Sequence, residues 1–108
     1  MLILPIKKKW FDMIKSGEKK EEYREIKPYY NSRFSFLDEI DKSGRTLRTY
    51  LTRMEIIFRN GYSSNSPKIK CDVEIIKGYG KEEWGAIPLK KYYVLRILNV
   101  EEIWLNLK

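Results

Sequence analysis

The absence of histidine, together with a single cysteine, most constrains what this chain of 108 residues can fold into. No disulfide can form within the chain, and no zinc site can be built from His or from several Cys. Stability must therefore come from one hydrophobic core, since a chain of this length can bury somewhat over half of its surface. The apolar fraction of 43% is sufficient for such a core. We expect residues 1–108 to form a single domain with no metal site and no cofactor.

The same absences limit the enzyme mechanisms that are open to the chain. A Ser-His-Asp triad and a Cys-His pair are both excluded. Acid–base groups would have to come from Lys, Glu, Asp, Tyr, Arg or the one thiol. That thiol, Cys71, lies on the apolar face of an alternating segment, which indicates a buried core residue rather than a nucleophile.

The net charge of +7 is concentrated in the N-terminal third, where residues 1–33 hold nine basic and five acidic residues. A basic excess attracts polyanions such as nucleic acid, although it is equally compatible with a solvated surface. The first residues do not have the order of a secretory signal, because the basic residues follow the apolar run. No segment is long enough to span a membrane. We therefore expect a cytoplasmic protein with no membrane partner.

The spacing of apolar residues predicts about five strands and two short helices, as in an α+β domain or a small open barrel. Ile69, Cys71, Val73 and Ile75 alternate with polar residues, which is typical of a strand with one buried face. Pro5 places the first strand at a sheet margin. The expected strands span about residues 2–6, 19–25, 54–59, 69–75 and 92–97, and the expected helices about residues 6–16 and 30–37.

The densest polar segment spans residues 17–24 and carries the first candidate site. Gly17 is a natural helix stop, and the following residues indicate a strand that is unusually rich in charge. In a strand, Glu22 and Arg24 share a face while Tyr23 points the other way. A carboxylate beside a guanidinium can hold the edge of a base or fix a phosphate. The alternative is a solvated edge strand whose charges deter aggregation.

A second candidate segment interleaves basic and aromatic residues. Lys27, Tyr29 and Tyr30 could combine phosphate contacts with stacking platforms for bases, as proteins that bind single-stranded nucleic acids do. The alternative assigns Tyr30 to the core and Lys27 to ordinary surface. Arg59 and Asn60, at the end of a strand, supply donors for a base edge or a carbonyl, although Asn60 also fits a simple hairpin turn.

With Gly17-Glu18-Lys19, Glu22 and Arg24 in view, the sequence resembles the ASCH family. The resemblance rests on an apolar strand and a helix, then a Gly-x-Lys turn and a strand that carries an Arg. It implies a small PUA-like β-barrel of about five or six strands with two short flanking helices. It also implies RNA or nucleotide binding in a cleft beside the Gly-x-Lys turn, lined by Lys19, Glu22 and Arg24.

A compact bacterial branch of this family consists of amidohydrolases that deacylate modified cytidine with a Lys, a Thr nucleophile and a Glu. This chain keeps the Lys as Lys19 and has Glu22 where the Thr would stand. A carboxylate cannot replace that nucleophile without a different intermediate. The later Glu corresponds to Glu74 if the resemblance extends that far. Lys19, Glu22 and Glu74 are thus the catalytic candidates of this alternative.

Three hypotheses follow from the sequence. The first is a module that binds RNA, another single-stranded nucleic acid or a nucleotide-like fragment, with a base held by Glu22, Arg24 and a Tyr face. The second is a small hydrolase of acylated nucleosides, and the third is a protein-interaction domain. The expected phosphate contacts of the first hypothesis are Lys7, Lys8, Lys9, Lys19 and Lys27.

Overall fold

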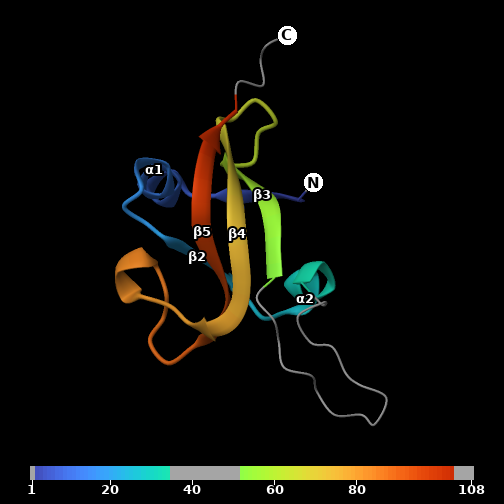
Figure 1. Cartoon of the computed structure of the whole chain (residues 1–108), viewed down its shortest axis with the longest axis vertical. Coiled ribbons are helices and arrows are strands. Elements are labelled where there is room, and N and C mark those ends of the chain that lie inside the picture. Colours follow the sequence, from blue (N-terminus) through green and yellow to red (C-terminus); the bar gives the residue numbers. More distant parts are fainter. Residues whose placement is uncertain (1, 35–51, 104–108) are drawn as a thin grey trace.

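Five strands and two α-helices form in residues 2–34 and 52–103, the residues that the computed structural model describes (Figure 1). In chain order the elements are β1 (Leu2–Ile6), α1 (Lys8–Ser16), β2 (Glu21–Glu25), α2 (Pro28–Phe34), β3 (Thr52–Asn60), β4 (Lys68–Tyr79), the 3₁₀ turn η2 (Glu82–Trp84) and β5 (Lys91–Glu102).

The strands form one mixed sheet in the order β1-β3-β4-β5-β2. β1 runs parallel to β3, and all other neighbours are antiparallel. The long central strands β4 and β5 bend, so that the sheet curls into a half-barrel (Figure 1). β1 and β2 are its two edges, and Pro5, which lacks a backbone N–H, lies in edge strand β1 as predicted.

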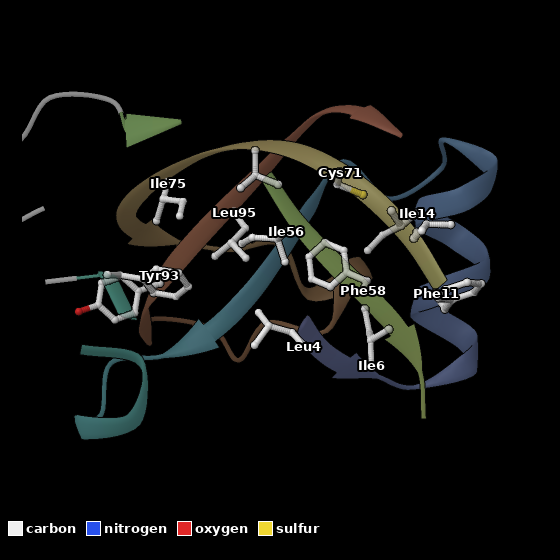
Figure 2. Packing of buried hydrophobic residues seen from close by; sticks show 13 residues of the cluster. Leu4, Ile6, Phe11, Ile14, Ile56, Phe58, Cys71, Ile75, Tyr93 and Leu95 are labelled. Carbon is white, nitrogen blue, oxygen red and sulfur yellow. The ribbon is translucent and has the colours of Figure 1, made fainter. Parts of the chain in front are cut away.

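The main core fills the inner face of the curled sheet. Alternate residues of β4, from Ile69 through Cys71 to Ile75, point into it and are fully buried. Phe11 and Ile14 of α1 close one side, and Figure 2 shows them packing beside Ile6 of β1, Phe58 of β3 and Cys71 of β4. The buried cluster consists of Leu4, Ile6, Phe11, Ile14, Phe34, Ile56, Phe58, Ile69, Cys71, Val73, Ile75, Tyr93 and Leu95.

A smaller apolar cluster covers the outer face of β5, where Ala86, Tyr92 and Val94 are buried and Tyr23 packs against them. The segment before η2 approaches so closely that a Cβ at Gly80 would lie 2.5 Å from the Tyr23 ring. Only glycine fits there. The Tyr23 hydroxyl accepts a hydrogen bond from the Lys81 N–H at 2.9 Å, which ties β2 to this covering segment.

The predicted α+β class, with five strands and two short helices, is confirmed for the described residues. β4 and β5 extend beyond the predicted ranges because the sheet supplies backbone partners as far as the Tyr79–Lys91 pair. β2 begins only at Glu21, so Lys19 lies in the turn after α1 rather than in the strand. Residues 35–37 of the predicted second helix lie outside the described residues. No described helix has the length and apolar character needed to cross a bilayer.

Burial, with a smaller effect of Asp72, raises the pKa of the Cys71 thiol from 9.0 to about 12. Above pH 9 the unfolded chain releases this proton while the folded chain keeps it, so the free energy of unfolding should fall as pH rises from 9 toward 12. The fall should reach up to about 1.4 kcal/mol per pH unit. Urea unfolding across this range measures it. Cys71→Ala should reduce the slope but not abolish it, since burial also raises the pKa of Tyr23 above 10.0, and equal slopes for both proteins would contradict the assignment.

Candidate functional site

The two edge strands face each other across an open seam in the half-barrel, because no backbone ladder joins β1 to β2. A pocket of about 270 Å³ lies in this seam. It is lined from β1 and α1 on one side and from β2 and α2 on the other. The lining residues are Pro5, Ile6, Lys7, Trp10, Glu22, Tyr23, Arg24, Glu25, Lys27 and Tyr30.

The Glu22 carboxylate is held from two sides by cations. Lys19 Nζ lies 3.3 Å from Oε1, and Arg24 Nη2 lies 2.8 Å from Oε2. The period of two along β2 places Glu22 and Arg24 on the inner face, as predicted. Their side chains are only 9% and 12% exposed, so the interpretation of this segment as a fully solvated edge strand is wrong for these residues.

Lys19 reaches Glu22 from the turn that ends α1. Gly17 adopts the left-handed conformation (φ 87°), and the Lys19 N–H then bonds to the Met13 carbonyl at 2.9 Å. Glycine takes this conformation without the steric cost of a Cβ. The turn therefore directs the Lys19 side chain inward, back beneath α1.

The Lys19 ammonium is completely removed from solvent, with a side-chain exposure of 0%. Nζ donates to the Trp84 carbonyl at 2.6 Å and lies about 5 Å from the ring centroids of Trp10 (4.8 Å) and Tyr23 (5.0 Å). Burial lowers the pKa of Lys19, whereas Glu22 opposes that effect. In this conformation the ammonium pairs with Glu22 and is shielded from solvent.

Arg24 joins three elements across the seam. Its Nη1 donates to the Tyr30 hydroxyl of α2 and its Nη2 to the Pro5 carbonyl of β1, both at 2.9 Å. The same Nη2 pairs with Glu22. Nε is buried and has no hydrogen-bond partner among the residues that the structure describes. The guanidinium thus links β1 to β2, as backbone hydrogen bonds link the other neighbouring strands of the sheet.

The rest of the pocket is aromatic and mainly basic. Trp10 and Tyr30 contribute rings. Lys7 and Lys27 are exposed lining residues, and Lys27 Nζ lies 3.7 Å from Glu25. Glu25 lies at the rim, where Lys90 holds it at 3.0 Å. The arrangement offers a fixed carboxylate acceptor and guanidinium donors beside flat rings, the combination that recognises a planar heterocycle with polar edges.

The sequence-predicted binding residues divide into two groups. Glu22, Arg24, Lys27 and Tyr30 line the pocket together, and Lys19 lies behind Glu22. Tyr29 is 46% exposed and lies outside the lining, with its ring against Tyr30 in an edge-to-face contact at 4.8 Å.

Arg59 and Asn60 are not part of the pocket lining. They pair with Pro5 and Ile6 in the register of β3 with β1, one strand away from the seam. The Arg59 side chain bonds to the Gly61 carbonyl at 3.2 Å, and the Asn60 N–H bonds to the Pro67 carbonyl at 3.0 Å. Both residues thus help to close the turn after β3.

Glu74 lies on the opposite face of the sheet from Glu22. Its neighbours Val73 and Ile75 point into the core, so the pleat turns Glu74 outward, where Arg53 lies 3.9 Å away. The hollow beside the Gly17 turn is also separate from the seam. It measures about 190 Å³ and is lined by Ile14, Gly17, Lys19, Lys20 and residues 97–100. The predicted single cleft therefore corresponds to two hollows with Lys19 between them.

The site includes residues that sequence reasoning missed. Trp10 packs against the core and also lines the pocket, and Glu25 lines it too, whereas their sequence patterns predict only a helix over residues 6–16 and a charged strand over residues 19–25. A Trp about two helical turns before the Gly-x-Lys turn is a sequence signal that could have indicated an aromatic ring in the pocket. The Pro5 and Trp84 carbonyls could not be predicted as acceptors, because every residue has a main-chain carbonyl whatever its type. No group of three or more acidic or Cys residues within the described ranges could hold a metal ion.

Comparison of the chain with protein-family models, curated proteins and solved structures gives no match. The resemblance to the ASCH family therefore stays a prediction. The candidate site rests on the geometry of the seam.

Glu22→Ala should lower the free energy of unfolding by about 3 kcal/mol, because it leaves two buried cations without their carboxylate. The double variant Lys19→Met/Glu22→Leu removes the buried pair at similar volume and should recover part of that loss, because Arg24 is still left without its carboxylate. Urea unfolding followed by circular dichroism measures both.

Glu74→Ala is the matched control for this loss of a carboxylate, since Glu74 lies on the outer face with only a 3.9 Å pair. It should change the stability by less than about 0.5 kcal/mol. A Glu22→Ala protein as stable as this control would show that the Lys19–Glu22–Arg24 triad does not support the fold.

Proposed function

We propose that this chain is a binding module for RNA, another single-stranded nucleic acid or a nucleotide-like fragment, and that it receives one base in the seam pocket. The observation that carries the proposal is the Glu22 carboxylate, held between Lys19 and Arg24 at the floor of an aromatic, basic pocket. Cytoplasmic action is part of the proposal.

The Glu22–Arg24 pair supports recognition of a base edge. Each carboxylate oxygen has a second lone pair that can accept from an exocyclic amine, and a guanidinium has five N–H donors. Arg24 uses three of its four Nη N–H groups on Tyr30, Pro5 and Glu22, which leaves one at Nη1 for a ligand. Because both groups are already fixed by the fold, a ligand would find its donors and acceptors in place.

The size of the pocket supports a ligand of one base rather than an extended strand. At about 270 Å³ it lies just below the range of roughly 300–1,000 Å³ that drug-sized molecules occupy. Trp10 and Tyr30 offer rings for stacking, and the exposed lining residues Lys7 and Lys27 suit the phosphates that flank a base. The neighbouring exposed residues Lys8 and Lys9 extend this basic margin.

The resemblance of Gly17, Lys19, Glu22 and Arg24 to the ASCH pattern supports the same function. These residues form the turn and the ion triad beside the pocket. Membership of that family, with a PUA-like barrel as the parent fold, is part of the proposal.

The amidohydrolase alternative has one observation in its favour, the lowered pKa of Lys19. A general base must come within hydrogen-bond reach of its substrate, however, and Lys19 Nζ is enclosed by Trp10, Tyr23 and the Trp84 carbonyl. Glu74 faces the other side of the sheet. The geometry therefore favours binding over hydrolysis.

Binding to a labelled single-stranded RNA, followed by fluorescence anisotropy, tests the proposal. Affinity should fall with salt, with a slope of about −0.7 for each phosphate that Lys7 or Lys27 neutralises. Glu22→Gln keeps the shape but loses the charge, and should weaken binding about tenfold, since a charge-assisted hydrogen bond contributes about 1.5 kcal/mol or more. Glu74→Gln is the matched control and should bind as the wild type does. Equal affinities of the Glu22→Gln and Glu74→Gln variants for the RNA would contradict the binding of a base in the seam pocket.

Incubation with acylated cytidine separates the two functions. No deacylated product should form under conditions in which a known amidohydrolase completes the reaction, because the Lys19 ammonium has no path to the substrate. Product detected by chromatography and lost in Lys19→Met would establish the hydrolase instead.

A further inference from the structure

The turn between β3 and β4, residues 61–67, presents an aromatic ring almost entirely to solvent. Tyr62 is 84% exposed, and Ser63, Ser64 and Asn65 beside it are exposed as well. Figure 1 shows this turn at the upper end of the half-barrel, opposite the connection that leads from β4 through η2 to β5. A ring so exposed buries little surface within the fold, so it contributes little to stability.

The 61–67 turn is held in one arrangement by the two cations that flank it. Arg59 Nε donates to the Gly61 carbonyl at 3.2 Å, and Lys68 Nζ donates to the Ser64 carbonyl at 2.6 Å. Both charged side chains therefore stay beside the exposed ring. A preformed turn of this kind loses less conformational entropy when a ligand binds to it.

The same turn lies beside the start of α1 and the seam pocket. The Gly61 N–H bonds to the Ile6 carbonyl at 3.0 Å, and Ile6 and Lys7 both line the pocket. Lys7, Lys8 and Lys9 follow one another at the beginning of α1 and are all exposed. A strand of nucleic acid that left the pocket past Lys7 would therefore meet the 61–67 turn next.

Positive charge predominates around the turn. Residues 59–68 contain two basic residues, Arg59 and Lys68, and no acidic residue. The acids at this end of the sheet are each paired with a lysine: Asp12 with Lys8 at 2.6 Å, Glu102 with Lys15 at 3.1 Å and Glu101 with Lys70 at 3.2 Å. Within residues 2–34 and 52–103, no acidic partner is left for Lys7, Lys9, Arg59 and Lys68. The surface around Tyr62 thus has the charge that complements phosphate groups.

We propose that Tyr62 is a second stacking platform, on which a nucleic-acid strand leaving the seam pocket places another base while Arg59 and Lys68 face its phosphates. This inference rests on the proposed function and names its ligand more closely: a single strand of several nucleotides rather than a free nucleotide. Exposed rings beside cations are how proteins hold single strands. The inference also gives a binding role to Arg59, which the sequence predicts as a ligand-binding residue and which lies outside the seam pocket.

A single-stranded nucleic acid fits this surface better than a lipid bilayer or an acidic peptide does. Tyr62 is the one aromatic residue of a turn that is otherwise mainly polar, whereas stable membrane attachment requires a larger apolar surface or two separate signals. An acidic peptide would use the cations but would leave the ring without a stacking partner. A single strand uses both, because every base has a face that stacks and every nucleotide carries a phosphate.

Fluorescence anisotropy tests the inference with a labelled single-stranded RNA of about twelve nucleotides, within the roughly 4–16 nucleotides that one single-strand-binding fold covers. Tyr62→Ala should weaken binding about tenfold, because it removes one stack of a base on an aromatic ring. Tyr62→Phe keeps the ring and should bind as the wild type does. Neither change should alter the affinity for ribonucleoside monophosphates, which reach only the seam pocket.

Tyr79→Ala is the matched control, since Tyr79 is 65% exposed at the end of β4, at the other end of the sheet. It should bind the RNA as the wild type does. All three variants should keep the wild-type melting temperature, because both tyrosines are exposed. Equal affinities of Tyr62→Ala and Tyr79→Ala for the RNA would overturn the inference. A loss in Tyr62→Phe as large as that in Tyr62→Ala would do the same, since stacking does not need the hydroxyl.

Glu22→Gln, measured with the same RNA, separates this inference from the proposed function. Binding that depends on Glu22 but not on Tyr62 would overturn the second platform and leave the seam pocket, whereas dependence on Tyr62 alone would support the platform and contradict the pocket. No binding by the wild type of the RNA or of the matching DNA strand would overturn both proposals. Attachment to phosphatidylserine vesicles that Tyr62→Ala loses, with its RNA binding unchanged, would identify a membrane contact instead.

Discussion

The buried triad of Lys19, Glu22 and Arg24 is the interaction on which the rest of this structure depends. It brings together the turn after α1, strand β2, edge strand β1 and helix α2. Removing three charged groups from water is expensive, so the arrangement is stable only because each group has partners of good geometry. Replacing a buried ion pair by apolar residues is often neutral for stability, whereas removing one partner is strongly destabilising. Here the ion pairs fix which face of β2 turns inward and where β1 lies relative to it.

The triad also explains why a half-barrel can hold together with its seam open. A sheet edge exposes unpaired backbone groups, and proteins cover such edges or block them. In this chain Pro5 removes one donor from β1, and the Arg24 guanidinium takes up the Pro5 carbonyl. Side-chain closure leaves room that a continuous ladder would fill. The pocket is thus a direct result of closing the sheet with a guanidinium rather than with a strand.

Much of this fold could be predicted from the sequence, because strong alternation and helix-stop signals are local. The structure confirms the strand predicted from the alternation of Ile69 to Ile75 and the helix end predicted at the glycine after Ser16. It also confirms that Pro5 lies in an edge strand. The shared face of Glu22 and Arg24 followed from the pleat alone.

The burial of Lys19 could not be predicted in the same way. Its partners include the carbonyl of Trp84, 65 positions along the chain, and that contact exists only once β5 lies beside β2. The seam itself depends on the parallel pairing of β1 with β3, which no short pattern encodes. The position of Glu74 could be predicted in part. Its apolar neighbours indicate that it points away from the core, but they do not indicate which face of the sheet carries Glu22.

The triad has one further consequence for electrostatics. Two cations share a single carboxylate, and their remaining hydrogen bonds go to the main-chain carbonyls of Trp84 and Pro5 and to the Tyr30 hydroxyl. The triad holds two cations for one acid, so it carries a surplus positive charge while Lys19 is protonated, and burial lowers the pKa at which that charge is lost. Because these groups are shielded from solvent, added salt screens their field far less than it screens surface lysines. Attraction at the opening of the seam should therefore weaken with ionic strength, while the field of the triad should respond mainly to pH, through the charge of Lys19.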